Sequence, residues 1–530
     1  MGQVLRDFHL PGRSAVFASN GLCATSHPLA AATAIDILKA GGNAMDAAIG
    51  GAVLLGLCEP QMTGLGGDCF VLFNPPSSDD VKAMNGSGRA PAALDPDAIR
   101  ALGHTVMPEG GALPVTIPGA VDAFCRLSED WGKLGLDRIL APAIEYFEAG
   151  IPVAPRTAID WQFTQQYLEG RARDFYLING AAPKVGQIYR NPAQAALLRL
   201  IARDGRKGFY EGPAAEDMLT ALSEAGGTHT VDDFANFACD YTDPVSGDYG
   251  SFEIVEHPPN GQGAAALLLM NILKRFDLAA MEPFGSQRAH IEAEATKLAY
   301  DARNRFIADS DHTTRLNHLL SETTADGLAS LIDPNRAMKS ATALSEQVHK
   351  DTIYITVVDR DRMAVSLIYS IFRSFGSGLA SDKFGILFQN RGSGFNLIPG
   401  HPNEAGGSKR PMHTIIPGML KTSGRVVQPF GVMGGAYQAN GHARFVSNLS
   451  DFGLDPQATI DAPRTFPWDG KLRIERGYDA NVLQELADKG HDVVIPDKPI
   501  GGAQTILIDH ANGTLQGASD PRKDGCAIGY

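Results

Sequence analysis

The sequence predicts an α+β protein in which helices dominate the first part of the chain and strands the last. Helical periodicity and capping signals recur up to about residue 306. From residue 352 onward, short runs rich in β-branched and aromatic residues alternate with turns. Apolar residues make up 44% of the 530 residues, which is ample core material. A chain of this length could hold about three or four average domains, or one or two built from large α/β layers.

The composition narrows the class of partner. A net charge of −14 argues against nucleic acid or an anionic membrane, although one basic pocket for a small anion remains compatible with it. The six cysteines show no C-x-x-C pair, which favours reduced, buried thiols over disulfides or a zinc site. The first residues lack the apolar core of a secretion signal, and no apolar run is long enough to span a bilayer. We therefore expect a cytoplasmic protein.

Helices are expected through most of the chain before residue 307. One at 29–40 is stopped by Gly41 and Gly42, and Asn43 can cap the next, at 44–57. A glycine turn then leads into a strand at 69–73, without the Lys-Ser/Thr of a phosphate-binding loop. The other ordered segments expected here are a strand and glycine loop at 81–92, a loop into a helix at 113–124, a mostly helical region at 139–235 with Thr230 as a cap, a turn into a buried helix at 257–273 and a helix near 287–306.

The composition and periodicity of the sequence change after about residue 308. Residues 309–350 are polar and weakly periodic, so we expect a loop or linker that ends at an exposed peptide bond before Thr352. A proline-glycine loop at 396–408 could act as a lid. The strands expected beyond residue 351 are 352–359, 364–372, 385–391, 412–420, 426–435, 503–510 and 513–519, with a helix near 439–449.

Thr352 heads the first of these strands, in the segment DTIYITVVD. A threonine hydroxyl is a weak nucleophile until a base lies beside it. The nearest base would be its own α-amine, which exists only if the chain is cut before Thr352. Such an amine titrates near pH ~8, so it is well placed to take a proton. On this stretch alone, a threonine that merely begins an edge strand is the commoner explanation.

Several ordered motifs reverse that preference. They are ATSHPLAAATAIDILKAGGNAMDAAI, EPQMTGLGGDCF, PGAVDAF, PPNGQG, EAEATKLAYDARNRF, DTIYITVVD, SFGSGLASDKFGILFQN, KRPMHTIIP, GVMGGAYQANGH and DPRKDGCAIGY. With them the chain resembles the γ-glutamyltranspeptidase family of N-terminal nucleophile hydrolases, from about residue 21 to 530. The resemblance implies a four-layer αββα sandwich. It also implies self-cleavage between Asp351 and Thr352, into a large subunit of residues 1–351 and a small subunit of residues 352–530 that build the fold together.

The resemblance assigns catalytic roles residue by residue. Thr352 matches the nucleophile, and Ser370 matches a hydroxyl residue that hydrogen-bonds to it. Gly434 and Gly435 match the pair whose N–H groups form the oxyanion hole, where glycine lets the main chain approach the developing charge. Arg89 matches the arginine that grips the substrate α-carboxylate, a task suited to a guanidinium fork. Read without the family, Ser370, the glycine pair and Arg89 fit a strand serine, a plain turn and a surface arginine equally well or better.

The substrate pocket departs from the family pattern. Gly394 stands where the family has an acidic residue that holds the γ-glutamyl ammonium, and Phe372 stands where an asparagine helps to bind it. His413 and Thr414 replace two adjacent serines, and Arg391 replaces a neutral amide. An ammonium would then be buried without a partner, which is costly. The pocket is expected to keep carboxylate recognition, to lose amine recognition and to become smaller.

A small amide that bears a carboxylate fits this description. The chain thus resembles the oxamate amidohydrolase branch of the superfamily, which cleaves oxamate to oxalate and ammonia in purine breakdown. Two other enzymatic readings stay open, a γ-glutamyltransferase or glutathione hydrolase and an acylase for a larger amide. An inactive scaffold that retains the fold is a further alternative.

The resemblance implies no organic cofactor, and the sequence gives little reason to expect a metal. His290 and Glu294 lie four residues apart on the helix near 287–306, but no third ligand of suitable spacing is apparent. The expected partners are the small anionic amide and the two fragments of one precursor, without nucleic acid or membrane. The oligomeric state is left open, with a homodimer of processed heterodimers as one option.

Overall fold

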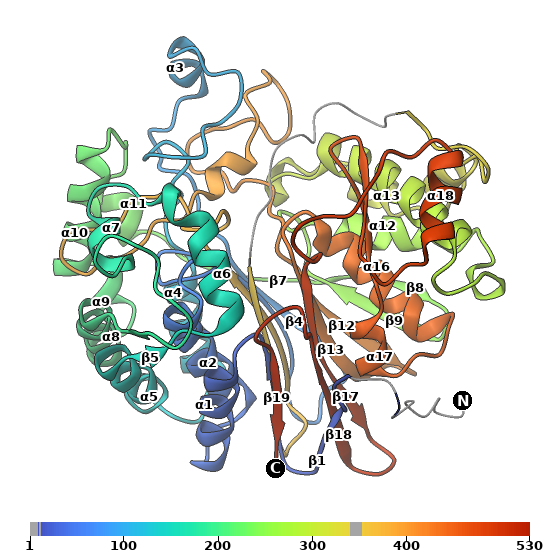
Figure 1. Cartoon of the computed structure of the whole chain (residues 1–530). Coiled ribbons are helices and arrows are strands. Elements are labelled where there is room, and N and C mark those ends of the chain that lie inside the picture. The colour runs from blue at the N-terminus through green and yellow to red at the C-terminus, as the bar shows by residue number, and fades with distance from the viewer. Residues whose placement is uncertain (1–8, 10–11, 340–351) are drawn as a thin grey trace.

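A computed structural model describes residue 9, residues 12–339 and residues 352–530. Its centre is a pair of seven-stranded antiparallel sheets that face each other. Helices cover the outer face of each sheet, one group on the left and one on the right of Figure 1. The expected four-layer αββα sandwich is therefore confirmed.

The first sheet holds the strand that follows Thr352 at its centre. Its strands, in spatial order, are β19 (Cys526–Gly529), β2 (Leu22–Thr25), β10 (Ile353–Val358), β11 (Ala364–Ser370), β3 (Asp68–Asn74), β4 (Lys82–Gly86) and β7 (Asp240–Thr242). All six residues of β10 are buried, as a strand covered on both faces requires. Strands from both sides of the expected cleavage point therefore pair within one sheet.

The second sheet also combines strands from before and after the expected cleavage point. Its strands, in spatial order, are β1 (Val16–Ala18), β18 (Thr514–Ser519), β17 (Gly502–Asp509), β13 (Arg425–Met433), β12 (Pro417–Thr422), β9 (Phe252–Glu256) and β8 (Val245–Tyr249). Apolar side chains of the two sheets meet between them, among them Leu72 of β3, Met419 of β12 and Ile506 of β17. This inner layer joins the two sheets into one core.

Helices before residue 240 cover the first sheet, where α2 in particular is buried along its whole length. These helices are α1 (Pro28–Lys39), α2 (Ala44–Cys58), α4 (Ala120–Trp131), α5 (Leu136–Ala149), α6 (Pro155–Thr164), α7 (Ala172–Tyr176), α8 (Pro192–Asp204), α9 (Lys207–Tyr210), α10 (Gly212–Glu224) and α11 (Val231–Ala235), with the 3-10 turn η1 (Gln165–Tyr167) and the small ribbon of β5 (Ile151–Pro152) and β6 (Ile188–Tyr189) among them. The short helix α3 (Pro96–Ala101) stands apart at the top of Figure 1 and packs in a separate apolar cluster with Phe395 and Leu397.

The second sheet is covered by α12, α13 and α16, whose apolar faces share one core. The elements on this side are α12 (Gly263–Leu273), η2 (Leu278–Ala280), α13 (Ser286–Phe306), η3 (Ser310–His312), α14 (Leu316–Leu319), α15 (Glu322–Ala329), α16 (Tyr437–Ser450), α17 (Pro456–Asp461), β14 (Thr465–Trp468), β15 (Lys471–Ile474), α18 (Ala480–Asp488) and β16 (Val493–Val494). The three short strands pair as a separate sheet.

The capping signals read from the sequence are confirmed. Asn43 accepts hydrogen bonds from the N–H groups of Met45 and Asp46, and Asp46 in turn accepts from the N–H of Asn43. Thr230 and Asp233 form the same reciprocal box at the start of α11. Each box satisfies at least two backbone N–H groups that a helix start would otherwise leave unpaired.

The expected linker at 309–350 is wrong over the part that the structure describes. Residues 310–329 form η3, α14 and α15, and Ser321 caps α15 by accepting from the N–H of Thr324. Leu319 is buried in the core shared with α12. Short helices with few apolar positions give too weak a period to recognise. Residues 340–351, including Asp351, lie outside the described residues.

Two further strand predictions are corrected. Residues 385–391 form no strand, because Gly385 has a φ of +61° and only a single bridge, Ala380 to Leu387, is made there. A 3-10 turn, η4 (Arg391–Gly394), follows directly. The strand expected at 412–420 begins only at Pro417. In both segments burial, and not pairing, accounts for the apolar residues.

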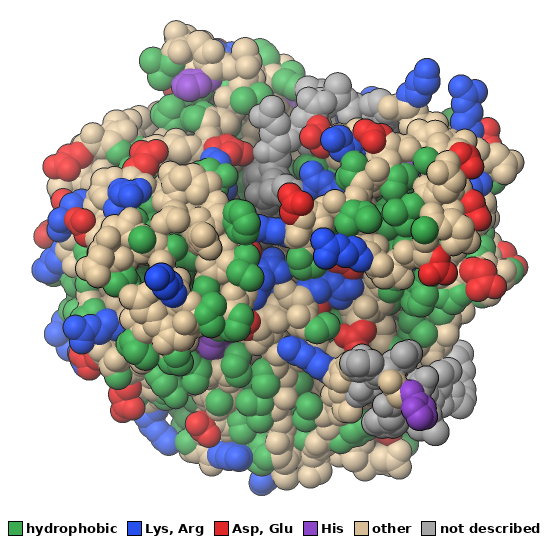
Figure 2. Space-filling view, in the orientation of Figure 1, with side chains coloured by type: hydrophobic (Ala, Val, Ile, Leu, Met, Phe, Trp, Pro, Cys, Tyr) green, Lys and Arg blue, Asp and Glu red, His purple; other side chains and the backbone are tan. Residues whose placement is uncertain are grey.

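The surface agrees with the composition. Figure 2 shows acidic and basic side chains interspersed over the face that it draws. Among the described residues, no helix is both long and apolar enough to cross a bilayer. All six cysteines lie in the described part and are free thiols, four of them buried.

Candidate functional site

Thr352 and Ser370 meet at one end of the two central strands of the first sheet. The register pairs Ile353 with Tyr369, which sets Thr352 opposite Ser370. The Thr352 hydroxyl lies 3.3 Å from the Ser370 hydroxyl and donates to it. Thr352 is only 1% exposed. The sequence predicted an exposed peptide bond between residues 351 and 352, but the Thr352 side of that bond is buried. The arrangement places two hydroxyls where one can orient the other.

Phe372 follows this pair with an unusual backbone. Its φ is +78°, a left-handed conformation that is rare for an aromatic residue and marks local strain. Its N–H donates to the Ser370 hydroxyl oxygen over 2.8 Å. Its ring lies against the Arg391 guanidinium, with 3.9 Å between the guanidinium carbon and the ring centre. The turn thus connects the hydroxyl pair to Arg391.

Asp68, which the sequence interpretation missed, is the centre of the site. It stands at the start of β3, directly opposite Ser370 in the strand register, and is fully buried. One carboxylate oxygen accepts from the Gln389 amide (2.7 Å) and the Gly88 N–H (3.1 Å). The other accepts from Arg391 Nε (3.2 Å) and His413 Nε2 (2.9 Å). Burial raises the pKa of Asp68, but the hydrogen bond and the charges outweigh it and hold the pKa below its usual value.

Arg391 is fully buried, and the contacts recorded for it use only part of its guanidinium. Its Nε pairs with Asp68, and its Nη1 lies 3.4 Å from the Thr414 hydroxyl. Its Nη2 is buried and has no hydrogen-bond partner among the described residues. Burial lowers the pKa of Arg391 to about 10, while Asp68 opposes this shift, so the side chain stays charged at neutral pH. A buried cationic N–H without a partner is a ready binding point for an anion.

His413 supports Asp68 as a neutral donor. Burial, together with the Arg391 charge, lowers the pKa of His413 from 6.5 to about 3. The unfolded chain therefore takes up a proton near pH 6.5 that the folded chain refuses until about pH 3. Stability from this residue is present above the unfolded pKa and is lost as the pH falls toward 3.

We expect His413→Gln to remove this dependence, because an amide still donates to Asp68 but does not titrate. Between about pH 7.5 and about pH 5, wild type should lose about 2 kcal/mol more stability than the variant. Thermal unfolding at matched protein concentration measures this. His312→Gln, at an exposed position, should follow wild type. Equal losses in wild type and His413→Gln would contradict the assignment.

Gly434 and Gly435 lie between β13 and α16. Both have positive φ, +121° and +58°, and this turns the main chain sharply at the strand end. Met433, just before them, shares a small buried cluster with Tyr354 of β10. The glycine pair is thereby brought to the end of the sandwich where β10 begins. It also precedes the N-terminus of α16, whose partial positive charge favours an anion.

Arg89 and Gly394 are placed differently from the other predicted residues. The N–H of Gly88 reaches Asp68, but the Arg89 side chain pairs with Asp309 at 3.4 Å and approaches Asp240 at 3.9 Å. It is 36% exposed. At position 394, an added Cβ would lie 2.7 Å from the main-chain oxygen of Met412. A side chain at this position therefore needs a shift of the main chain.

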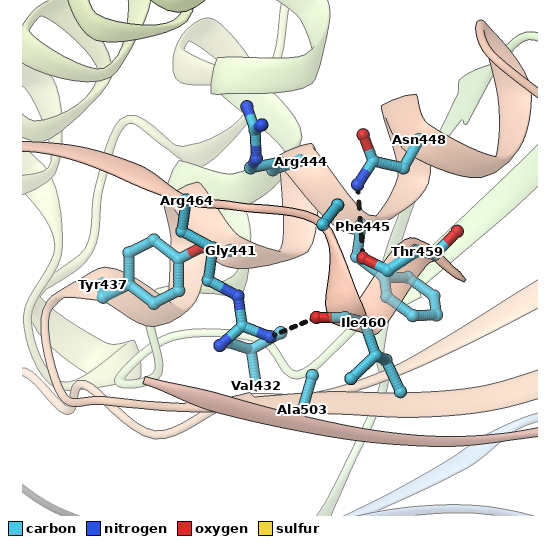
Figure 3. A pocket seen from close by; sticks show the side chains of 11 residues that line it. Val432, Tyr437, Gly441, Arg444, Phe445, Asn448, Thr459, Ile460, Arg464 and Ala503 are labelled. Atoms are coloured by element: carbon cyan, nitrogen blue, oxygen red, sulfur yellow. Dashed lines mark hydrogen bonds between the residues drawn. The ribbon is translucent and has the colours of Figure 1, made fainter. Parts of the chain in front are cut away.

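A small cavity near the site does not belong to it. It lies among β13, α16 and the segment after α17, with Arg464 beside the Tyr437 ring (Figure 3). Its volume is about 10 Å³, which is about the room for one water molecule. None of the predicted site residues lines it.

A group of metal-ligating side chains lies elsewhere, against α13. His290 and Glu294 are joined by His491, and one ligand atom from each lies within 4.8 Å of the others. No third ligand of suitable spacing was apparent from the sequence, and the fold supplies His491 as a candidate. His491 comes from a segment far along the chain, and only the fold reveals that it lies here.

Comparisons with known proteins agree with this architecture. The sequence model described as Gamma-glutamyltranspeptidase matches residues 30–530. The chain is 34% identical to the glutathione hydrolase-like YwrD proenzyme of Bacillus subtilis (strain 168), over 97% of this chain and 99% of the relative. It is 32% identical to the oxamate amidohydrolase proenzyme of Klebsiella pneumoniae, with the same two coverages. The crystal structure of cephalosporin acylase from Bacillus halodurans matches with a TM-score of 0.92 and 35% identity, over 100% of this chain and 99% of that one.

Proposed function

Because the chain belongs to the gamma-glutamyltranspeptidase family and is an amidohydrolase of the N-terminal nucleophile type, we propose that it cleaves itself between Asp351 and Thr352 and then hydrolyses a small amide that bears a carboxylate. Oxamate, cleaved to oxalate and ammonia, is the simplest substrate of this kind. A cytoplasmic location, a place in purine breakdown and a homodimer of processed heterodimers are parts of the same proposal. The relatives named above are proenzymes, which supports the cleavage.

Thr352 and Ser370 supply the nucleophile in this proposal. The Thr352 α-amine takes the hydroxyl proton while Oγ1 bonds to the amide carbon. The C–N bond then breaks, and the amine returns the proton to the leaving ammonia. Water attacks the resulting ester, with the same amine as base, and releases the acid. The 3.3 Å contact with Ser370 supports this role, because it fixes the hydroxyl before substrate arrives.

Gly434 and Gly435 are proposed to stabilise the oxyanion. Their positive φ values turn main-chain groups at the N-terminal end of α16, which suits them to a developing negative charge. One well-placed donor of this kind is typically worth about 3–4 kcal/mol of the barrier. Main-chain donors at glycine also leave room for the substrate carbonyl to approach.

The observation that carries the substrate proposal is the buried, unpartnered Nη2 of Arg391. A carboxylate placed there would gain a charge-assisted hydrogen bond in a site shielded from water. A relay of contacts from Thr352 to Ser370, from Ser370 to Phe372 and from the Phe372 ring to Arg391 makes Arg391 part of the surroundings of the nucleophile pair. Arg89 is already paired with Asp309, so we assign it the lesser part in binding the anion.

The same site offers little to an ammonium group. Gly394 carries no carboxylate, and its close contact with Met412 opposes the gain of one. Asp68 is the nearby carboxylate, but Arg391 and His413 already occupy its second oxygen. An amino-acid end would therefore be desolvated without a counter-charge.

A second candidate is a glutathione hydrolase, favoured by the 34% identity to the YwrD proenzyme. The two are separated by an ammonia-release screen of small amides, run beside γ-glutamyl-p-nitroanilide on processed enzyme. We expect ammonia from oxamate and little p-nitroaniline. Comparable rates on both would contradict the reading of Gly394 and Phe372. No turnover of any amide, together with tight oxalate binding, would point to a scaffold.

A further inference from the structure

His290, Glu294 and His491 converge in the layer that covers the second sheet. The first two lie one turn apart on α13 and therefore share a face of the helix. The third follows α18, whose end packs on α13 through an apolar cluster that includes Ala289, Ala293 and Leu486. All three residues of the group are buried. Two imidazoles and a carboxylate thus meet in a water-poor interface.

The end of α18 holds His491 in place. The His491 N–H donates to the Leu486 carbonyl, and the Gly490 N–H donates to the Ala487 carbonyl. These two bonds and the positive φ of Gly490, +97°, form a Schellman motif. The motif fixes the main chain up to His491, and the side chain is held by its contact with His290.

The donor atoms are close to the spacing that a tetrahedral metal needs. His491 Nε2 lies 2.8 Å from His290 Nδ1 and 4.0 Å from Glu294 Oε1. Ligands at about 2.0–2.1 Å from a tetrahedral zinc ion stand about 3.4 Å apart. Opening the first distance and closing the second needs movements below about 1 Å, within the reach of side-chain rotation.

The surroundings of His290 prepare it as a ligand. Its Nε2 lies 2.8 Å from the carbonyl oxygen of Asp333, an acceptor only, so Nε2 carries the hydrogen and donates it. This leaves the Nδ1 lone pair to accept from His491 Nε2–H, and when a metal binds, that hydrogen moves to His491 Nδ1 so that Nε2 can act as a ligand. A backbone carbonyl that fixes the tautomer of a histidine is the usual outer partner of a metal-bound imidazole.

Charge and access are also compatible with a metal. Lys297 pairs with Glu294 Oε1 at 2.7 Å and is the competitor that a cation must displace. Its side chain is 21% exposed and lines a 220 Å³ cavity that His491 also lines, which gives the ammonium a way out and a cation a way in.

We propose that His290, Glu294 and His491 form a binding site for a divalent transition metal, of which zinc is the best match. Two imidazoles and one carboxylate suit zinc and its neighbours and do not suit magnesium or calcium, which prefer oxygen ligands. If the proposed cleavage before Thr352 occurs, the metal joins the two fragments, because α13 precedes the cut and His491 follows it. The ligand group itself does not depend on the cleavage.

The test is metal binding by tag-free, full-length protein stripped with a chelator. Zn²⁺ and Mg²⁺ are titrated separately by calorimetry, bound metal is counted by mass spectrometry, and Co²⁺ serves as an absorption probe of tetrahedral geometry. The variants are His491→Gln and Glu294→Gln. The exposed His312→Gln is the matched control.

We expect wild type and the control to bind about one equivalent of Zn²⁺ and to unfold at a higher temperature with it. Both ligand variants should bind Zn²⁺ at least about tenfold more weakly and lose the visible Co²⁺ bands. Two results overturn the proposal. One is a wild type that binds well below about half an equivalent. The other is equal binding by wild type and both variants, which would assign the metal to cysteines or other histidines.

Discussion

Thr352→Ala is expected to leave one band on a denaturing gel and to abolish activity, whereas wild type gives two bands. In proportion to 351 and 179 of 530 residues, the 56.4 kDa chain should yield fragments of about 37 and about 19 kDa. The physical reason is that alanine lacks the hydroxyl that attacks, and without that hydroxyl the α-amine has no proton to accept. Loss of a nucleophile that acts with its base costs about 10⁴-fold or more in kcat.

Two further variants make this result specific. Thr352→Ser keeps a hydroxyl and should still process and turn over substrate. Thr356→Ala is the matched control, because Thr356 is a buried threonine of β10 whose hydroxyl donates to the Val365 carbonyl (2.9 Å). It should process normally and lose about 1 kcal/mol of stability. Processing and activity in Thr352→Ala would place the nucleophile elsewhere.

Arg391→Met is expected to lower kcat/KM for oxamate by about 10²–10³-fold, equivalent to about 3–4 kcal/mol. Methionine fills much of the same volume but offers no charge to the carboxylate. The loss should be confined to anionic substrates. The ratio of oxamate to oxamide turnover therefore measures recognition apart from any damage to the site. Arg89→Lys should cost less, and a larger loss there would make Arg89 the carboxylate ligand.

Arg391→Met also strips Asp68 of its cation, and a buried charge left alone destabilises a protein by about 3–5 kcal/mol. Adding Asp68→Asn should recover much of this stability without recovering oxamate turnover. Arg464→Lys supplies a second control, because Arg464 is a buried partner of Asp520 outside the site. It should lower stability and leave the KM for oxamate unchanged.

The nucleophile pair and the pocket around it differ in how far the sequence reveals them. Local pattern located the two strands that hold Thr352 and Ser370, but only the resemblance to a family gave these two residues their roles. Asp68 follows a glycine-rich turn, at the first residue of β3, and nothing in this short segment signals its chemistry. Its partners Gln389, Arg391 and His413 lie more than 300 residues away in segments outside the named strands, and only the tertiary fold brings them together.

The predictions of secondary structure that proved wrong have similar causes. Local capping rules located α2 and α11, because each box lies within four residues. The segment 385–391 has a strand-like composition, but Gly385 turns the chain there and tertiary burial accounts for its apolar residues. His491 could be read from a Lys-Gly-His helix end only as a cap, since nothing local tells which helix will face it.

If the proposed cleavage before Thr352 occurs, the interleaving of strands from both sides of it should make folding irreversible. In the first sheet β10 hydrogen-bonds to β2, and β11 hydrogen-bonds to β3. The two fragments therefore cannot separate without breaking the hydrogen bonds between central strands. Before the cut, the two parts find each other at the high effective concentration of a single chain. After it, the same search is bimolecular between two incomplete sheets with open edges. The mature enzyme should therefore keep its shape by the slowness of its unfolding and, once denatured, fail to regain it from the separated fragments.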